Sequence, residues 1–155
     1  MTADGPILIA YDGSPGAQSA LAYAGSLLGP RDAVVVSVWE PLLLQAGTIA
    51  LSGMVVDAET VARDDEAIES ATRTLATDGA ELARKAGFTA EARWQRGAGP
   101  IADAIIEVAE EIGASLIVTG NRGLGGLKSL LVGSVSDRLM HHASRPVLIV
   151  PRDEA

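Results

Sequence analysis

The chain has 155 residues, of which 48% are apolar and only 3% aromatic, so its core must be built mainly from Ala, Val, Leu and Ile. Its net charge of −8, from 20 acidic and 12 basic residues, argues against a nucleic-acid backbone as partner, because such partners select basic surfaces. The lack of cysteine excludes disulfides, thiolate metal sites and a thiol nucleophile, and fits the cytoplasmic location that we expect.

The length predicts one domain over residues 1–155, enough to bury about 70% of the surface of the unfolded chain. We expect no secretory leader, because no basic region precedes a long apolar run near the N-terminus. No apolar stretch reaches the 18 residues of a membrane span, so we expect no membrane partner. No internal repeat or low-complexity segment interrupts the chain.

Strand and helix patterns alternate from the N-terminus onward. The first expected strand, residues 6–11, is a short apolar run, and Ser14 followed by Pro15 is typical of a helix N-cap and first helical position. The second strand, residues 33–39, is almost continuously apolar, as expected when both faces are covered. Between them, one helix face carries Ala17, Leu21, Ala24 and Leu28.

Residues 40–58 fit no regular pattern. The segment contains several apolar residues and two glycines. A connection of this length in a compact domain is usually functional or mobile. Its apolar character favours a lid or an interface segment, and the alternative is a disordered loop.

The second half continues the alternation. A long helix is expected over residues 59–86, ended by Gly87. Apolar and polar residues alternate over 89–95, which predicts a strand with one face more exposed to solvent than the other. Further elements are expected at 101–112 (helix), 115–119 (strand), 135–143 (helix) and 147–150 (strand). The core face of the helix at 101–112 is predicted to carry Ile101, Ile105, Val108 and Ile112.

Alternating strands and helices predict an α/β fold, a doubly wound five-stranded parallel sheet of order 3-2-1-4-5 with helices on both faces, as in flavodoxin-like and Rossmann-like proteins. In that order the chain changes direction between the first and fourth strands. Ligands of open α/β sheets bind at such a switch point, beyond the carboxyl ends of the strands. Asp12 follows the end of the first strand, and Gly120 lies at the end of the fourth. We therefore expect the site between these two residues.

The loop after the fourth strand holds five glycines in the fourteen residues 120–133. Glycines allow close backbone approach to a ligand, and a helix start favours an anion through its unpaired N–H groups and dipole. We expect Ser134 to cap this last helix, with Asp137 completing a capping box. The loop therefore predicts a phosphate site, and the alternative is that its glycines and Ser134 are only structural.

Two common nucleotide motifs do not fit the loop. Leu127 separates Gly126 from Lys128, so it is not a P-loop, and no G-x-G-x-x-G follows the first strand. Arg122 and Lys128 could neutralise phosphate charge, or they are solvated loop charges.

His141 and His142 are interpreted as residues of a helix C-terminus rather than a catalytic pair. They lie about 10 Å from the expected phosphate end, at about 1.5 Å per residue. Trp39 and Trp94 are expected in the core or at its rim rather than as stacking platforms.

The spacing Gly-x2-Gly-x9-Gly-Ser, formed by Gly120, Gly123, Gly133 and Ser134, resembles the nucleotide-binding signature of the universal stress protein family. Asp12-Gly13-Ser14, Val38, and the segments 125–136 and 142–150 are also similar to that family. The resemblance covers nearly all of the chain outside residues 40–58.

This resemblance implies ATP and Mg²⁺ as ligands. Gly120, Gly123, Gly133 and Ser134 would hold the triphosphate and ribose. Asp12 would lie near the ribose or a phosphate-bound Mg²⁺, which makes it the candidate metal ligand. The adenine would be flanked by Ala10 and Val38, the latter offering backbone groups to its edge.

The same resemblance implies further residues of the expected pocket. Thr119 and Val135 would line it. Asn121 stands where a small hydroxyl residue or His is frequent in the family, and Tyr11 is bulkier than many residues at its position. The Tyr11 ring is therefore expected to narrow the adenine pocket.

The favoured hypothesis is an ATP-binding protein with a regulatory or sensor role in the stress response. We expect slow hydrolysis at most, because no convincing base to position water is available. Alternatives are a cyclic AMP-binding module, a weak ATPase or phosphotransferase, and an interaction protein whose loop is vestigial. A homodimer is expected through Val147 to Val150, an apolar edge strand in the predicted order, and the family commonly dimerises there.

Overall fold

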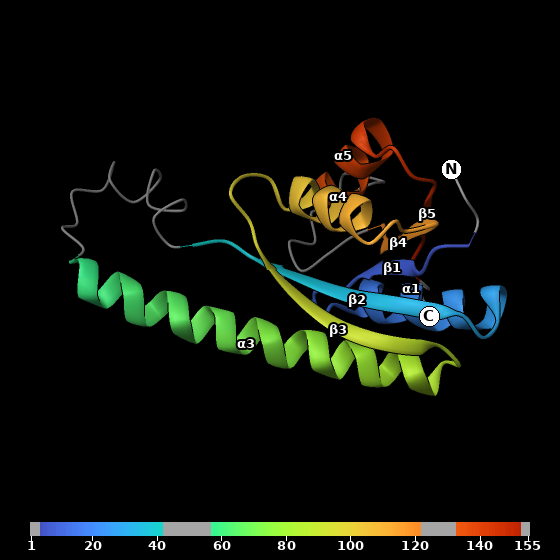
Figure 1. Cartoon of the computed structure of the whole chain (residues 1–155), viewed down its shortest axis with the longest axis horizontal. Helices are drawn as coiled ribbons and strands as arrows, with labels where there is room; N and C mark the ends of the chain where they lie inside the picture. The colour runs from blue at the N-terminus through green and yellow to red at the C-terminus, as the bar shows by residue number, and fades with distance from the viewer. Residues whose placement is uncertain (1–3, 42–56, 122–132, 153–155) are drawn as a thin grey trace.

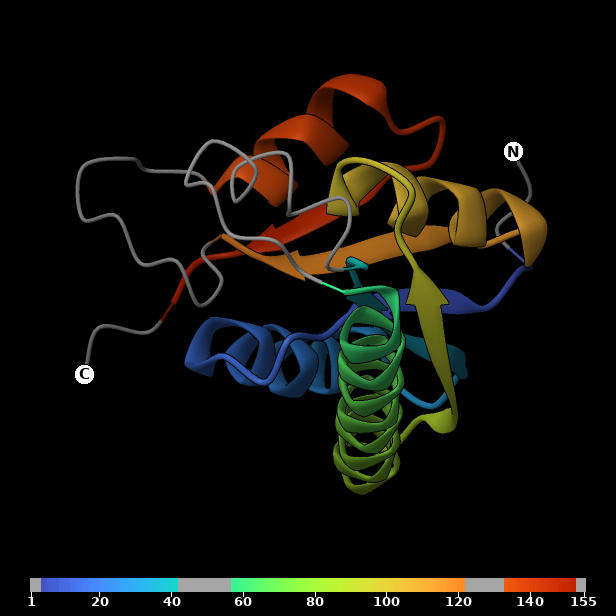
Figure 2. The ribbon, with the colours of Figure 1, turned by 90° about the vertical axis from the view of Figure 1, so that its left-hand side faces the viewer.

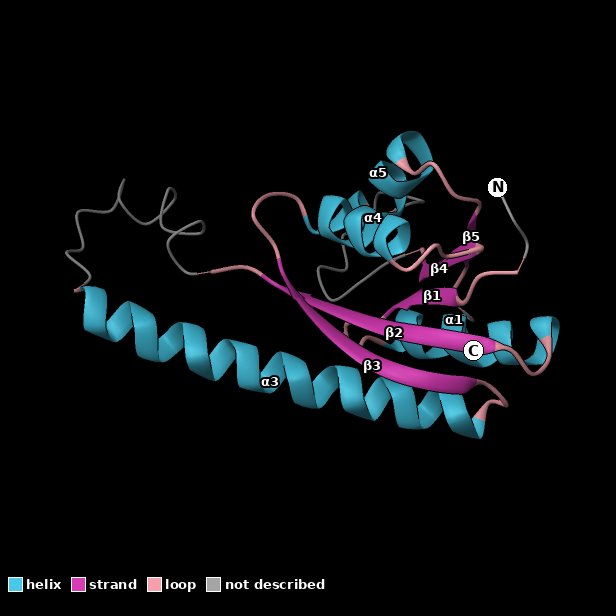
Figure 3. Cartoon of the chain, viewed as in Figure 1, coloured by secondary structure: helices cyan, strands magenta, loops and turns pink. Residues whose placement is uncertain are grey.

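The computed structural model describes residues 4–41, 57–121 and 133–152, and contains a five-stranded parallel sheet (Figures 1 and 3). The strands are β1 (Ile7–Ala10), β2 (Asp32–Trp39), β3 (Thr89–Arg96), β4 (Leu116–Gly120) and β5 (Val147–Val150). Their order is β3-β2-β1-β4-β5, and every neighbouring pair is parallel. The predicted fold class and strand order are confirmed.

Helices cover both faces of the sheet. They are α1 (Pro15–Leu28), α3 (Ala58–Lys85), α4 (Ile101–Glu111) and α5 (Ser134–His142). Figure 2 shows α4 and α5 on one face of the sheet and α1 and α3 on the other. Each expected element is present, with ends that differ from the predicted ones by two residues at most.

Alternate side chains of β1, β2 and β4 enter two separate cores. Ile7 and Ile9 of β1 belong to the core against α1 and α3, whereas Leu8 and Ala10 belong to the core against α4 and α5. Because side chains alternate along a strand, a strand buried on both faces must be apolar throughout. This explains the continuous apolar runs in the sequence.

The helix ends follow local chemistry. Ser14 caps α1 as predicted, since its Oγ accepts the Ala17 N–H at 3.1 Å and Pro15 is the first helical residue. Asp57 caps α3 by accepting the Thr60 N–H at 2.9 Å, and it also accepts the Thr60 hydroxyl at 2.7 Å. The hydroxyl bond and then the backbone bond lower the pKa of the Asp57 carboxyl. Gly87 follows the end of α3 with a φ of +103°, a conformation that favours glycine.

Helix α3 is long relative to the sheet that it covers. Its 28 residues span about 42 Å, against about 26 Å for the eight residues of β2. Its N-terminal end extends past the strands in Figure 1. Among the described residues, no helix combines the length and apolar character needed to cross a bilayer.

Candidate functional site

The candidate site lies at the switch point, where β1 and β4 end side by side. The ladder continues beyond β1, because the Tyr11 N–H donates to Val36 O at 2.9 Å. Asp12 follows and is half-buried, and its Oδ1 accepts the Ser14 N–H at 2.9 Å. This bond holds the Asp12 carboxylate at the start of α1, beyond the carboxyl end of β1.

Gly120 ends β4 against the first turn of α1. A Cβ at this position would lie 2.8 Å from both the carbonyl carbon and the oxygen of Gly16. Backbone atoms cannot move aside as a flexible side chain can, so β4 and α1 approach this closely only with glycine at position 120. The packing alone explains this first glycine of the signature.

Several residues predicted to surround the adenine share one face of the sheet. Ala10 is a buried member of the core on the α4 and α5 side, and Val38 and Val135 pack against that core. Thr119 is 6% exposed and lies two residues beyond Ile117, a member of the same core. The structure therefore gathers these four residues around one region near the carboxyl ends of the strands.

Tyr11 lies on the opposite face. Its ring packs in the core beneath α1 and α3, where a Cβ on Gly79 of α3 would lie 2.7 Å from Tyr11 Cδ1. Burial is the main cause that raises the pKa of Tyr11. The expectation that the Tyr11 ring narrows a pocket beside Ala10 is not supported, because successive strand residues point to opposite faces.

The start of α5 differs from the prediction by one residue. Gly133, not Ser134, is the N-cap, and no side chain of the described residues caps the helix. Ser134 is the first helical residue and is exposed, so the predicted capping box of Ser134 and Asp137 is wrong. Ser136 is the third helical residue, and its buried hydroxyl lies 3.1 Å from Gly133 O.

Asn121 connects β4, β5 and α5. Its N–H donates to Val150 O at 2.9 Å, and its carbonyl accepts the Gly133 N–H at 2.6 Å. The Ser136 hydroxyl reaches the same carbonyl at 3.2 Å, and Asn121 Oδ1 accepts the Arg152 N–H at 3.2 Å. The sequence pattern indicates neither these contacts of Asn121 nor the role of Ser136, because the partners lie 12 to 31 residues away in the chain.

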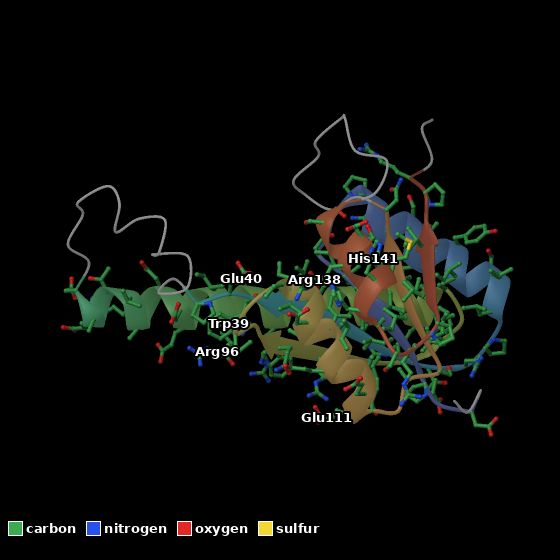
Figure 4. The ribbon with its side chains drawn as sticks, turned by 90° about the horizontal axis from the view of Figure 1, so that it is seen from above. Trp39, Glu40, Arg96, Glu111, Arg138 and His141 are labelled. Carbon is green, nitrogen blue, oxygen red and sulfur yellow. The ribbon has the colours of Figure 1, made fainter. Side chains whose placement is uncertain are left out.

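A bidentate ion pair joins α4 to α5. Arg138, labelled in Figure 4, donates from Nε and Nη2 to the two carboxylate oxygens of Asp103 at 2.6 and 2.8 Å. Hydrogen bonding from Arg138 lowers the pKa of Asp103 and raises that of Arg138. Nothing in the sequence pairs these residues, which are 35 positions apart.

The two tryptophans lie at the rim of the core rather than at the switch point. Trp39 is 8% exposed, with the Arg96 guanidinium 5.9 Å from its ring centroid (Figure 4). Trp94 is half-buried, with Arg73 at 4.8 Å. The expectation of rim or core positions is confirmed for both.

The two histidines are exposed in the last turn of α5, as expected for helix C-terminal residues. The His141 ring Nδ1 lies 2.8 Å from Asp137 O within the same helix. Three predicted residues of the glycine loop, Arg122, Gly123 and Lys128, lie outside the described residues, as does most of the segment 40–58.

The strand order, the two helical layers and the position of Asp12 and Gly120 define a doubly wound α/β protein with its candidate site at the switch point. The chain belongs to the universal stress protein family, whose sequence model matches residues 5–151. It is 31% identical to the universal stress protein YxiE of Bacillus subtilis over 145 residues, which cover 93% of this chain and 97% of that protein. It is 34% identical to the putative universal stress protein SH1215 of Staphylococcus haemolyticus over 149 residues, covering 96% and 85%.

Solved structures share the fold. The MJ0577 protein superposes with a TM-score of 0.73 at 20% identity, covering 99% of this chain and all of that one. A universal stress protein in complex with cAMP gives a TM-score of 0.66 at 24% identity, covering 98% and 100%. The universal stress protein from Archaeoglobus fulgidus in complex with dAMP superposes with a TM-score of 0.59 at 20% identity, covering 96% of this chain and 99% of that one.

Proposed function

We propose that this protein binds an adenine nucleotide, ATP with Mg²⁺, at the switch point and acts as a cytoplasmic regulatory or sensor protein of the stress response. The observation that carries the proposal is the signature Gly120, Gly123, Gly133 and Ser134 in a chain of this family. Its described members lie at the carboxyl end of β4 and at the start of α5, beside the strand end that precedes Asp12.

The start of α5 supports phosphate binding. The first backbone bond within this helix runs from the Asp137 N–H to Gly133 O at 2.8 Å. The N–H groups of residues 134–136 precede it and have no partner further back in the helix. Such groups, together with the positive end of the helix dipole, favour an anion. Ser134 is exposed there and can offer its hydroxyl to the ligand.

The apolar residues on the α4 and α5 face support adenine binding. Ala10, Val38 and Val135 give a flat purine ring apolar contacts, and Thr119 adds a hydroxyl at the edge of the same region. Arg122 and Gly123 complete the proposed contacts from the loop. Tyr11 would contribute only the second lone pair of its carbonyl, since its ring lies on the other face, its N–H donates to Val36 O, and the Ser37 hydroxyl donates to the same carbonyl at 2.7 Å.

The described residues fit Mg²⁺ only as an ion that arrives with the nucleotide. Mg²⁺ is usually held by one or two carboxylates together with substrate phosphates and water. No group of three or more His, Cys, Asp or Glu side chains suited to a metal occurs among the described residues. Asp12 would supply one carboxylate oxygen, and the nucleotide phosphates would supply further ligands.

Cyclic AMP is the second candidate ligand, because a structural neighbour of this chain was solved with cAMP. One phosphate would need less charge neutralisation than three, and the same loop could hold it. Calorimetry with ATP–Mg²⁺ and with cAMP, measured side by side, distinguishes the two, and mass spectrometry of the co-purified small molecule gives an independent answer.

Asp12→Asn tests the ATP–Mg²⁺ hypothesis directly. We expect this variant to weaken ATP binding in the presence of Mg²⁺ more than in EDTA, because the lost charge acts on the metal. Asp32→Asn is the matched control, since Asp32 begins β2 at the opposite end of the sheet. Wild-type protein that binds no adenine nucleotide would overturn the proposal and favour a purely structural interaction protein.

We further propose that binding, not turnover, is the function. Hydrolysis needs a group that positions water and a charge clamp on the phosphoryl group, and the sequence offers no convincing base. Steady-state assays should give turnover below about 1 per second, the low end of ordinary kinases. Faster turnover, lost in Asp12→Ala, would instead favour an ATPase or phosphotransferase.

The proposed partner is a second copy of the chain, bound at β5. Strand β5 is at the sheet edge, and the first three of its four apolar residues are only partly buried. Three of the four large apolar side chains that are exposed among the described residues belong to the helices beside it, namely Tyr23, Leu27 and Met140.

The orientation of these side chains supports the same interface. Gly25 faces α3, because its Cβ would lie 2.5 Å from Ala86 O, and both Tyr23 and Leu27 lie roughly opposite Gly25 around α1. Arg138 faces α4, and Met140 lies roughly opposite it around α5. The exposed apolar side chains therefore lie on the flanks nearest β5, where a second copy would cover them.

A further inference from the structure

Asn121 makes its contacts in two directions. Toward β5, its N–H donates to Val150 O at 2.9 Å, and its side-chain Oδ1 accepts the Arg152 N–H at 3.2 Å. Toward α5, its carbonyl accepts the Gly133 N–H at 2.6 Å. A single residue thus bridges the end of β5 and the start of α5.

The start of α5 depends on this bridge, because this nine-residue helix has no side-chain cap among the described residues. Gly133 and Ser136 both direct a donor at the Asn121 carbonyl, at 2.6 and 3.2 Å. The position of that carbonyl therefore fixes the direction in which the N–H groups of residues 134–136 point.

The side chain of Asn121 keeps the carbonyl in place. The backbone N–H of Asn121 bonds to Val150 at the end of β5, and its side chain bonds to Arg152 two residues further on, so residue 121 extends the β4–β5 ladder by one more rung. A serine at this position is one bond shorter and could not reach the same N–H without a backbone shift. Asparagine at position 121 is thereby explained without any contact to a ligand.

We propose that Asn121 is a positioning residue for phosphate, which acts by anchoring the start of α5 to the end of β5. This inference rests on the proposed nucleotide function and adds a role to a residue outside the Gly and Ser positions of the signature. It predicts that loss of the Asn121 side-chain bond weakens the affinity for ligands with phosphate and leaves the affinity for the nucleoside alone unchanged.

The test compares ATP–Mg²⁺ with adenosine, which lacks phosphate, by calorimetry on the full chain. The variants are Asn121→Ala, which removes the acceptor, and Arg152→Pro, which removes the N–H donor beyond the end of β5. Arg152→Gln is the matched control, because it loses the charge and keeps the N–H. One lost hydrogen bond should weaken ATP binding about three- to tenfold in each of the first two variants.

Four further results are expected. Adenosine binding stays within about twofold of the wild type in both variants, Arg152→Gln binds ATP normally, and thermal unfolding shows that the variants remain folded. The double variant Asn121→Ala/Arg152→Pro binds ATP no more weakly than the single variants, because both remove the same bond.

Other outcomes overturn the inference. Unchanged ATP binding in Asn121→Ala would show that residue 121 positions nothing, while the proposed function would stand. An equal loss for ATP and adenosine would indicate a general structural role. Wild-type protein that binds ATP, cAMP and adenosine equally poorly would refute the proposed function itself, and this inference with it.

Discussion

The two edges of the sheet differ in chemistry. At the β3 edge, Arg93 forms an ion pair with Glu111 of α4 at 2.6 Å, and Trp94 lies under Arg73 and donates to Glu69 at 3.3 Å. At the β5 edge, the strand is entirely apolar. Charged edge strands resist pairing with another chain, whereas exposed apolar edges favour it. This difference is the reason for proposing β5, and not β3, as the edge that pairs with a second copy.

The largest expected effect comes from a charge placed in β5. Leu148→Lys should weaken dimerisation about 100-fold, because the ammonium would be desolvated beside the apolar strand of a second copy. Sedimentation velocity across a concentration series measures the change. Thr89→Lys, on the exposed start of β3, introduces the same charge at the other edge and should leave the assembly unchanged.

Leu148 also packs against the core, so circular dichroism must show that Leu148→Lys remains folded. A folded Leu148→Lys protein with wild-type assembly would exclude the β5 edge as the interface. So would a stable wild-type monomer at micromolar concentration.

The next effect compares two close contacts on the α1 and α3 face of the sheet, one at β4 and one beneath α3. Gly120→Ala should destabilise the protein by about 1–3 kcal/mol, because the new Cβ meets Gly16 backbone atoms at 2.8 Å. Gly79→Ala should also destabilise the protein, because the new Cβ meets the buried Tyr11 ring at 2.7 Å and Val35 Cγ1 at 2.9 Å, but the net loss should be smaller by the gain of about 1 kcal/mol in helix propensity. Urea unfolding measures both losses, with Gly99→Ala as the control, since no atom lies within 4 Å of a Cβ there.

A smaller effect is expected from the helix flanks beside β5. The double variant Tyr23→Ser/Leu27→Ser should weaken dimerisation about tenfold, because it removes apolar area from the proposed interface. These side chains are 52% and 55% exposed, so their loss should leave the fold intact. Leu82→Ser in α3 is the matched control at 36% exposure, and an equal effect of Leu82→Ser would contradict the proposed interface.

The smallest expected effect is the loss of stability from the Arg93–Glu111 ion pair at the β3 edge at low pH. Hydrogen bonding from Arg93 lowers the pKa of Glu111. Because the folded pKa is lower than the unfolded value of about 4.3, this pair stabilises the protein above that pH, and its contribution is lost as the pH falls through the folded pKa. The melting temperature of Glu111→Gln should therefore fall less than that of the wild type between pH 6 and 3, whereas Glu107→Gln in the same helix should behave like the wild type.

Local patterns allowed most elements to be predicted. The N-cap of α1 needed only Ser14 and Pro15, which are adjacent in the chain. The cap of α5 was misplaced because Ser134 offered the right side chain, while the hydrogen bond of Gly133 to Asn121 decided where the helix begins. Propensity identifies candidate caps, and distant partners select among them.

The candidate site also combines features that are visible in the sequence with features that only tertiary contacts explain. The glycine spacing is visible in the sequence, but the reason for Gly120 is its contact with Gly16, more than 100 residues earlier. Ala10 and Tyr11 are neighbours in the chain and both were placed in one pocket, yet the sheet directs them to opposite faces. Residues 122–132 of the loop lie outside the described residues, so their roles remain predictions.

The sequence by itself determined the order of the elements, the parallel sheet and the family, because burial on both faces requires apolar strands and the loop motif is contiguous. Only the tertiary structure decided which residues share a face, where α5 starts, and how the two edges differ. The physical reason is that these features depend on hydrogen bonds, ion pairs and close contacts between residues far apart in the chain, such as Asn121 with Arg152 and Arg138 with Asp103.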